Sequence, residues 1–94
     1  MSQEQKAQDE IRRGVLAQQV IDNPIFQEAI LRVKGRLMAE FEGTKFFQRK
    51  KRDEIWRTFQ NLKSIEAEIK KVMTSGKVGE RTLSIIKGNK KAES

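Results

Sequence analysis

The sequence predicts an all-α protein: a long antiparallel helical hairpin with a short N-terminal helix packed on it and a flexible basic C-terminal tail. Three observations predict this class. Apolar residues recur at helical spacings over most of the chain. The only proline directly follows an asparagine, which is typical of a helix start. The chain has 94 residues, which is enough for one small domain.

The first helix is expected over residues 9–22, after a polar segment that we expect to fray. Ile11, Val15 and Gln18 would share one face of this helix. Gly14 weakens it by about 1 kcal/mol relative to alanine. The helix must end near Asn23, because a residue before a proline is disfavoured in the helical conformation.

The second helix is expected over residues 24–42. Asn23 can cap its free backbone N–H groups, and Pro24 fits the first helical position. Gly43 is expected to end the helix. Its apolar residues form one continuous stripe, namely Phe26, Ile30, Val33, Leu37 and Phe41.

The third helix is expected over residues 45–75, ending at Ser75 and Gly76. Glu66 precedes Lys70 by four residues, which favours a surface ion pair between them. Two sets of residues recur every seven positions and form a predicted seam: Ile55, Leu62 and Ile69, and Thr58, Ile65 and Val72.

The helical domain is expected to span residues 1–78, with a short segment and a basic tail over residues 79–94. Residues 80–87 fit either a short helix or a strand, and we favour the helix because no second strand is available for pairing. The third helix is expected to be longer than the second by about ten residues. Its unmatched part must therefore be covered by the first helix, by the C-terminal segment or by another subunit.

The composition argues against catalysis. The chain has no His and no Cys, so it lacks the usual general base at neutral pH, a thiolate nucleophile and the common zinc ligands. No glycine-rich loop of the phosphate-binding kind is present. We therefore expect a protein that is not an enzyme and that binds no cofactor, metal ion or small-molecule substrate.

The formal net charge of +7 is unevenly distributed. Residues 1–44 hold six basic and seven acidic residues, whereas residues 45–94 hold fourteen basic and six acidic residues. Such asymmetry favours an anionic partner, either DNA or an acidic protein surface. No apolar run approaches a membrane span, and the polar N-terminus does not resemble a secretory signal. We expect no membrane partner.

A run of cations, Arg49 to Arg52, is the main candidate for nucleic-acid binding. The adjacent Phe46 and Phe47 would either stack on exposed bases or anchor the turn. The alternative for the whole run is a solvated helix start compensated by Asp53 and Glu54, and the sequence gives the two equal weight. For the C-terminal lysines, spacing favours a solubilising tail over contact with a phosphate backbone. The full set of candidate nucleic-acid-binding residues is Lys45, Arg49, Lys50, Lys51, Arg52, Arg57, Lys87, Lys90 and Lys91.

A protein interface is expected as well, because so short a chain buries too little surface to be more than marginally stable alone. Trp56 would be either a partly buried core residue or an interface anchor, and its position one residue off the seam favours the core residue. A homo-oligomer is therefore expected. The candidate interface residues are Phe46, Phe47, Trp56, Phe59, Ile65, Ile69, Val72 and Met73.

Two stretches of the chain carry a resemblance to a known group of proteins. They are DNPIFQEAI at residues 22–30 and RDEIWRTFQNLKSIEAEIKKVMTSGK at residues 52–77. In their order and separation they resemble small helical proteins from the head and DNA-packaging gene clusters of tailed bacteriophages. The resemblance covers about residues 11–78, and the chain departs from it at Arg49 to Arg52, which are more basic than the group's pattern.

The resemblance and the charge together predict a non-enzymatic phage structural or DNA-packaging accessory protein. It would self-associate through its helical hairpin, with its basic half facing DNA or an acidic partner, in the bacterial host cytoplasm or in the virion. Two alternatives stay open. One is a small nucleic-acid-binding regulator, and the other is a phage-encoded inhibitor that docks on a host protein.

Overall fold

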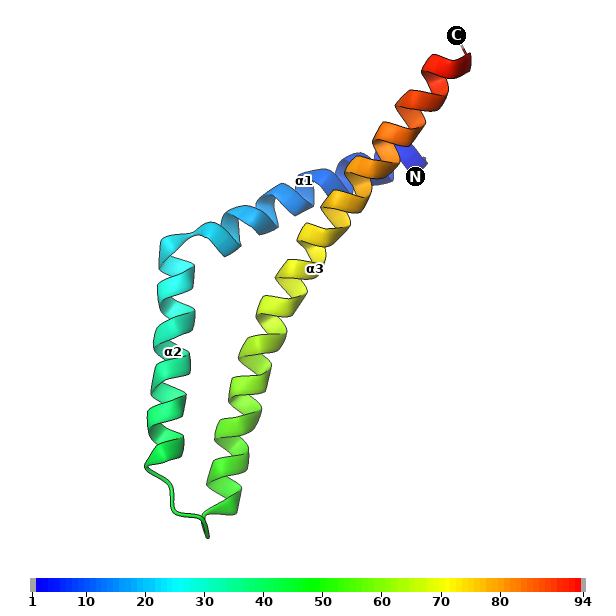
Figure 1. The fold of residues 1–94 in the computed structure, drawn as a ribbon. Coiled ribbons are helices and arrows are strands. Elements are labelled where there is room, and N and C mark those ends of the chain that lie inside the picture. Colours follow the sequence, from blue (N-terminus) through cyan, green and yellow to red (C-terminus); the bar gives the residue numbers. More distant parts are fainter. Residues whose placement is uncertain (1, 94) are drawn as a thin grey trace. The chain divides into compact units, whose positions relative to one another are not determined.

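A computed structural model describes residues 2–93, and the side chains of residues 2–88. It contains α1 (Gln3–Asp22), α2 (Pro24–Glu42) and α3 (Arg49–Glu93), as Figure 1 shows. Every regular element in the described range is a helix, so the all-α prediction is confirmed. The chain divides into two compact units. We call residues 22–67 the central unit, and residues 1–21 with 68–94 the terminal unit.

The first helix begins earlier than the sequence predicted. The Ser2 hydroxyl accepts a hydrogen bond from the Gln5 backbone N–H at 3.1 Å. In return, the Gln5 side-chain oxygen accepts from the Ser2 backbone N–H at 3.2 Å. This reciprocal pair is a capping box, which satisfies N–H groups that would otherwise be free at a helix start. Because these local bonds stabilise the first turn, α1 starts at Gln3 and not near residue 9.

The boundary between α1 and α2 follows the predicted capping. The Asn23 side-chain oxygen accepts from the backbone N–H groups of Ile25 and Phe26, at 2.9 and 3.1 Å. Pro24 occupies the first helical position, where its missing N–H has no cost. Gly43 is the C-cap of α2, and its own N–H donates to the Ala39 carbonyl. Both ends of α2 are therefore determined by local sequence.

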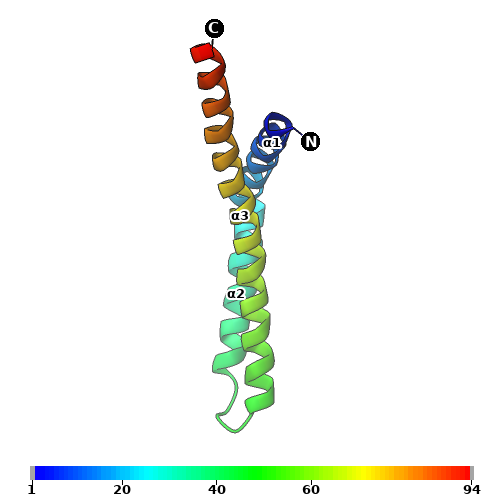
Figure 2. The same ribbon diagram turned by 90° about the vertical axis from the view of Figure 1, so that its right-hand side faces the viewer.

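The central unit is built from α2 and the first part of α3, which lie side by side in Figures 1 and 2. The predicted stripe of α2 is its less exposed face, and Leu37 is buried there. On α3 the corresponding buried residue is Ile55. Lys34 Nζ lies 2.7 Å from Glu66 Oε1, with both side chains less than a third exposed. An ion pair thus supplements a small apolar core.

Glu66 changes the predicted seam of α3. The sequence paired Glu66 with Lys70 across one helical turn, but the contact in the structure is with Lys34 of α2. Glu66 is partly buried, whereas the predicted seam residues Thr58 and Ile65 are exposed. Hydrophobic periodicity assigned Ile65 to the seam because it is apolar. It could not assign Glu66, which is charged, because the Lys34 that offsets this charge is distant in sequence.

The terminal unit depends on small residues. A Cβ atom placed on Gly14 of α1 would lie 2.8 Å from the Gly76 Cα of α3. A Cβ atom on Gly79 would lie 2.8 Å from the carbonyl oxygen of Ala7. Both distances are shorter than real side chains tolerate, so the two helix backbones are in direct contact. Ala7, Gly14 and Ala17 are the buried residues of α1.

This packing corrects two predictions. The α1 face was expected to hold Val15, but Val15 is 52% exposed and the smaller residues face α3. Gly76 was expected to end the third helix and Gly79 therefore to lie beyond it. Neither has a positive φ, and α3 continues through both. Close backbone contact offsets the intrinsic helix cost of a glycine of about 1 kcal/mol.

The third helix is consequently longer than predicted. It runs from Arg49 to Glu93, where the sequence predicted a helix over residues 45–75 followed by a short segment and a tail. Residues 80–87, expected as a separate short helix, belong to α3. Within the terminal unit α1 packs on this later part of α3. The first helix was one of the three elements that the sequence analysis considered as cover for the unmatched part of the third helix.

The glycine contacts lead to a stability prediction. We expect Gly76→Ala to lower the free energy of unfolding by about 1–3 kcal/mol, because its Cβ would lie 2.9 Å from the Gly14 Cα and push two backbones apart. Gly35→Ala in α2 is the matched control, since nothing lies within 4 Å of its Cβ position. That control should gain about 1 kcal/mol from helix propensity. Urea denaturation followed by circular dichroism measures both, and equal gains would contradict the close crossing.

Candidate functional site

The turn between α2 and α3 is closed by its own hydrogen bonds. The Thr44 hydroxyl and backbone N–H both donate to the Phe41 carbonyl, at 2.6 and 3.0 Å. The Lys45 N–H donates to the Gln48 side-chain oxygen at 2.8 Å, and the Gln48 N–H donates back to the Lys45 carbonyl. Gln48 also accepts from the Arg52 N–H and so stands directly before α3. The turn therefore holds its shape without help from nearby aromatic rings.

The first turn of α3 is made of the predicted cations. The helix begins at Arg49, so Arg49, Lys50, Lys51 and Arg52 all lie where free backbone N–H groups already carry partial positive charge. No acidic residue shares that turn. Arg49, Lys50 and Lys51 are exposed, and none of the three forms an ion pair with another described residue. The result is a concentrated positive potential at one helix end.

Arg52 differs from its three neighbours. Its guanidinium carbon lies 4.4 Å from the centre of the Phe41 ring, a cation–π contact between α3 and α2. Its side chain is partly buried, and its Nε is shielded from solvent without a hydrogen-bond partner among the described residues. Arg52 therefore links the two helices of the central unit, whereas the other three cations face solvent.

The aromatic residues of the turn are open to solvent. Phe46 is 81% exposed and Phe47 is 66% exposed. Their rings meet edge to face with centres 5.8 Å apart, and Lys45 Nζ lies 5.8 Å from the Phe47 ring centre. The sequence left open whether these rings anchor the turn. Their exposure excludes that role, because an anchoring ring would be buried.

Trp56 adjoins this surface and is 58% exposed. It stacks on Phe59 one turn further along α3, with ring centres 6.3 Å apart and planes 11° apart. The alternative of a partly buried core residue is therefore not what the structure shows. A shallow pocket of about 350 Å³ is lined by Phe41, Phe46, Arg49, Arg52, Asp53 and Trp56. We call these six residues the turn pocket.

Arg57, Lys87, Lys90 and Lys91 were also predicted as candidate nucleic-acid-binding residues. Arg57 is exposed on α3 but is not among the residues that line the pocket. Lys87 belongs to the terminal unit, where it borders a shallow hollow together with Ile11 and Leu83. The side chains of Lys90 and Lys91 lie outside the described residues. Sequence reasoning in turn placed Phe41 only in the apolar stripe, and it treated Asp53 only as a compensating charge.

The remaining predicted interface residues are a mixed set. Ile65 is 53% exposed. Phe59, Ile69, Val72 and Met73 are partly buried. Met73 shares a small hollow with Ile11 and Gly14 in the terminal unit, so α1 covers part of the predicted interface.

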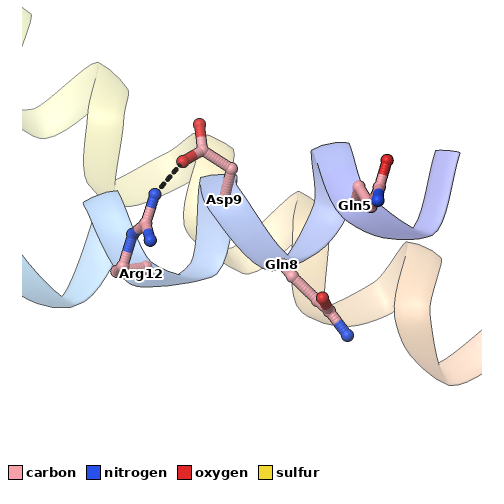
Figure 3. A pocket seen from close by; sticks show the side chains of 4 residues that line it. All are labelled: Gln5, Gln8, Asp9 and Arg12. Atoms are coloured by element: carbon pink, nitrogen blue, oxygen red, sulfur yellow. Dashed lines mark hydrogen bonds and ion pairs between the residues drawn. The ribbon is translucent and has the colours of Figure 1, made fainter. Parts of the chain in front are cut away.

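A further hollow lies on α1 alone, between the side chains of Gln5, Gln8, Asp9 and Arg12. Figure 3 shows Arg12 paired with Asp9, while Gln8 points away from that pair. The two charges neutralise each other on an exposed helix surface. We assign no chemistry to this hollow.

The described range shows neither a metal site nor a buried catalytic group. No group of three or more acidic residues there has the arrangement of a metal site. None of its polar or charged residues is buried, so no desolvated acid or base stands out as a catalytic group. No helix in that range is both long enough and apolar enough to cross a membrane.

Comparison of the chain with models of protein families, with curated proteins and with solved structures finds no match. The turn pocket and its flanking cations must therefore be interpreted from their own chemistry.

The position of the cations leads to a prediction about stability. We expect Lys50→Glu to raise the free energy of unfolding by about 1 kcal/mol, because an acid in the first turn complements the helix dipole where a lysine opposes it. Lys70→Glu, exposed in the interior of α3, should give no such gain because the dipole effect is confined to the ends. Chemical denaturation of both variants measures the difference. A loss of stability in Lys50→Glu would show that Lys50 makes a stabilising contact.

Proposed function

We propose that this protein is a non-enzymatic nucleic-acid-binding accessory protein that acts in the assembly of phage heads or in DNA packaging. The observation that carries the proposal is the set of exposed, unpaired cations in the first turn of α3. Uncompensated cations at a helix N-terminus cost stability. Phosphate groups would relieve that cost, because they bind both the cations and the free N–H groups.

The phage context of the proposal comes from the resemblance of residues 22–30 and 52–77 to small proteins of head and packaging gene clusters. In that context the protein works in the host cytoplasm or in the virion, where packaged DNA is the abundant anion. The first turn of α3 with its exposed Arg49, Lys50 and Lys51, which we call the basic turn, would face this DNA. A nucleic-acid-binding regulator would use the same surface, but it would require sequence-specific contacts to base edges.

Self-association through the antiparallel helical hairpin is the second part of the proposal. The buried apolar residues of the described chain are Ala7, Ala17, Leu37 and Ile55. Many large apolar side chains remain at the surface, with Leu31 69% and Ile65 53% exposed in the central unit. A second copy of the chain would bury such residues and supply stability that a small core does not.

An inhibitor that docks on a host protein is the rival with a specific observation in its favour. Phe46 and Phe47 are exposed at the turn, and the exposed Trp56 of α3 lines the same pocket as Phe46. Exposed aromatic residues are common anchors of protein interfaces. Such an inhibitor would not require nucleic acid, so the binding measurement below separates it from the proposed function.

The proposed function predicts DNA binding that weakens steeply with salt. Fluorescence anisotropy with labelled DNA should show binding at low salt, with log affinity falling linearly against log salt. The double variant Lys50→Glu/Lys51→Glu should bind at least tenfold more weakly, and its slope should be shallower by about one for each lost phosphate contact. Absence of binding at low salt would contradict the proposal.

The matched control is Arg13→Glu/Arg36→Glu, which lowers the formal net charge by the same amount. Both residues are exposed, and both lie outside the basic turn. This control should bind nearly as well as the unsubstituted protein. An equal loss in both double variants would indicate attraction by net charge alone and would argue against a localised site.

Self-association predicts a molecular mass above the 10.9 kDa of one chain in sedimentation equilibrium, increasing with concentration. Ile65→Glu should shift this equilibrium toward the single chain by at least tenfold, because it places a charge in a predicted apolar contact. Ile25→Glu, at a 71% exposed position outside that set, is the control. A strictly single chain at high concentration would contradict this part of the proposal.

A further inference from the structure

The two phenylalanines of the turn are not explained by phosphate binding. Phe46 is the most exposed large apolar side chain among the described residues. The turn is closed by hydrogen bonds of Thr44, Lys45 and Gln48, and it gains nothing from rings that point into water. A duplex backbone would need only the cations. The rings therefore indicate a ligand that carries an apolar, planar part beside its charge.

The geometry of the Phe46 and Phe47 rings leaves room for the planar group of a ligand. Their planes are 81° apart, so the edge of one ring contacts one flat face of the other. The side chains are 81% and 66% exposed, so ring faces outside this contact remain accessible. Phe46 also lines the turn pocket together with Arg49, Arg52 and Trp56. One concave surface thus offers aromatic faces and cations next to each other. A nucleotide presents a base and a phosphate in the same close arrangement.

Whether Phe46 and Phe47 can stack on bases depends on whether those bases are paired. In a duplex the flat faces of the bases are stacked on each other, and a protein reaches only their edges and the phosphates. In a single strand the faces are free to stack on aromatic side chains, which is the common way of binding unpaired nucleic acid. Exposed rings beside cations therefore favour single strands.

An anionic lipid surface is the other ligand that exposed rings and cations would suit. Asp53 argues against it, because this acidic residue lines the turn pocket together with the cations and Trp56. A carboxylate repels a dense layer of anionic headgroups. It can instead accept hydrogen bonds from the amino and imino groups of an unpaired base.

We propose that the turn pocket, together with the adjacent Phe47, is a binding site for single-stranded nucleic acid. The rings of Phe46 and Phe47 stack on unpaired bases, while Arg49 and Lys50 contact phosphates. This inference rests on the proposed function and specifies its ligand. It assigns the aromatic residues to the choice of single strand over duplex, and the cations to overall affinity.

The test compares four ligands at one salt concentration. They are a single-stranded oligonucleotide, a duplex of the same length, an abasic single strand with the same number of phosphates, and anionic phospholipid vesicles. The single strand should bind on the order of tenfold more tightly than the abasic strand and the duplex, because stacking adds to affinity base by base. It should also quench the fluorescence of Trp56, the only tryptophan in the chain.

The variant Phe46→Leu/Phe47→Leu keeps apolar side chains at exposed positions but removes the rings. It should bind the single strand no better than the abasic strand, with an unchanged salt slope. The control Ile25→Ala/Met38→Ala removes two exposed apolar side chains elsewhere in the central unit and should retain the preference for the single strand.

The possible failures are distinguishable. If none of the nucleic acids binds at low salt, the proposed function fails and this inference fails with it. If single strand, duplex and abasic strand bind equally, the proposed function stands and the inference is overturned. Tighter binding to vesicles than to the single strand also overturns it, in favour of a lipid surface.

Discussion

The direct contact between the backbones of Gly14 and Gly76 is the constraint on which the terminal unit depends. Neither position has space for a Cβ atom, so α1 can lie on α3 only where both helices carry small residues. Ala7 and Gly79 repeat the same condition along the crossing. The contact also explains why α3 continues past Gly76 and Gly79, because these two of its three glycines are used for packing. Each would otherwise have weakened or ended the helix.

The central unit is stabilised differently, by a thin apolar contact with polar reinforcement. Leu37 and Ile55 are its buried apolar residues, and the Lys34–Glu66 ion pair and the contact of Arg52 with Phe41 add to them. Two helices alone cannot surround one another's side chains, so many apolar residues stay at the surface. The same geometry that limits stability makes those residues available to a partner.

The basic turn shows a conflict between stability and charge placement. Arg49, Lys50 and Lys51 lie at the helix end where cations are least favourable. Phe46 and Phe47 are exposed although polar residues are the usual occupants of exposed turns. Local rules are broken here in two independent ways within a few residues. Such departures are expected at functional sites, where a ligand compensates for what the free protein loses.

The sequence by itself determined the helical class, the capping at Asn23, the apolar stripe of α2 and the position of the cations. Each of these depends on residues close in the chain, and local backbone bonding and periodicity express them fully. Only the tertiary structure decided that Gly76 lies within a helix, that Glu66 pairs with Lys34 and that Phe46 is exposed. Those outcomes depend on which distant backbones touch, and hydrophobic periodicity gives no weight to a glycine and rejects a charged residue. For the glycines the physical reason is that a missing side chain lets two helix backbones come into contact. That gain depends on a distant segment of the chain, which a local sequence pattern does not include.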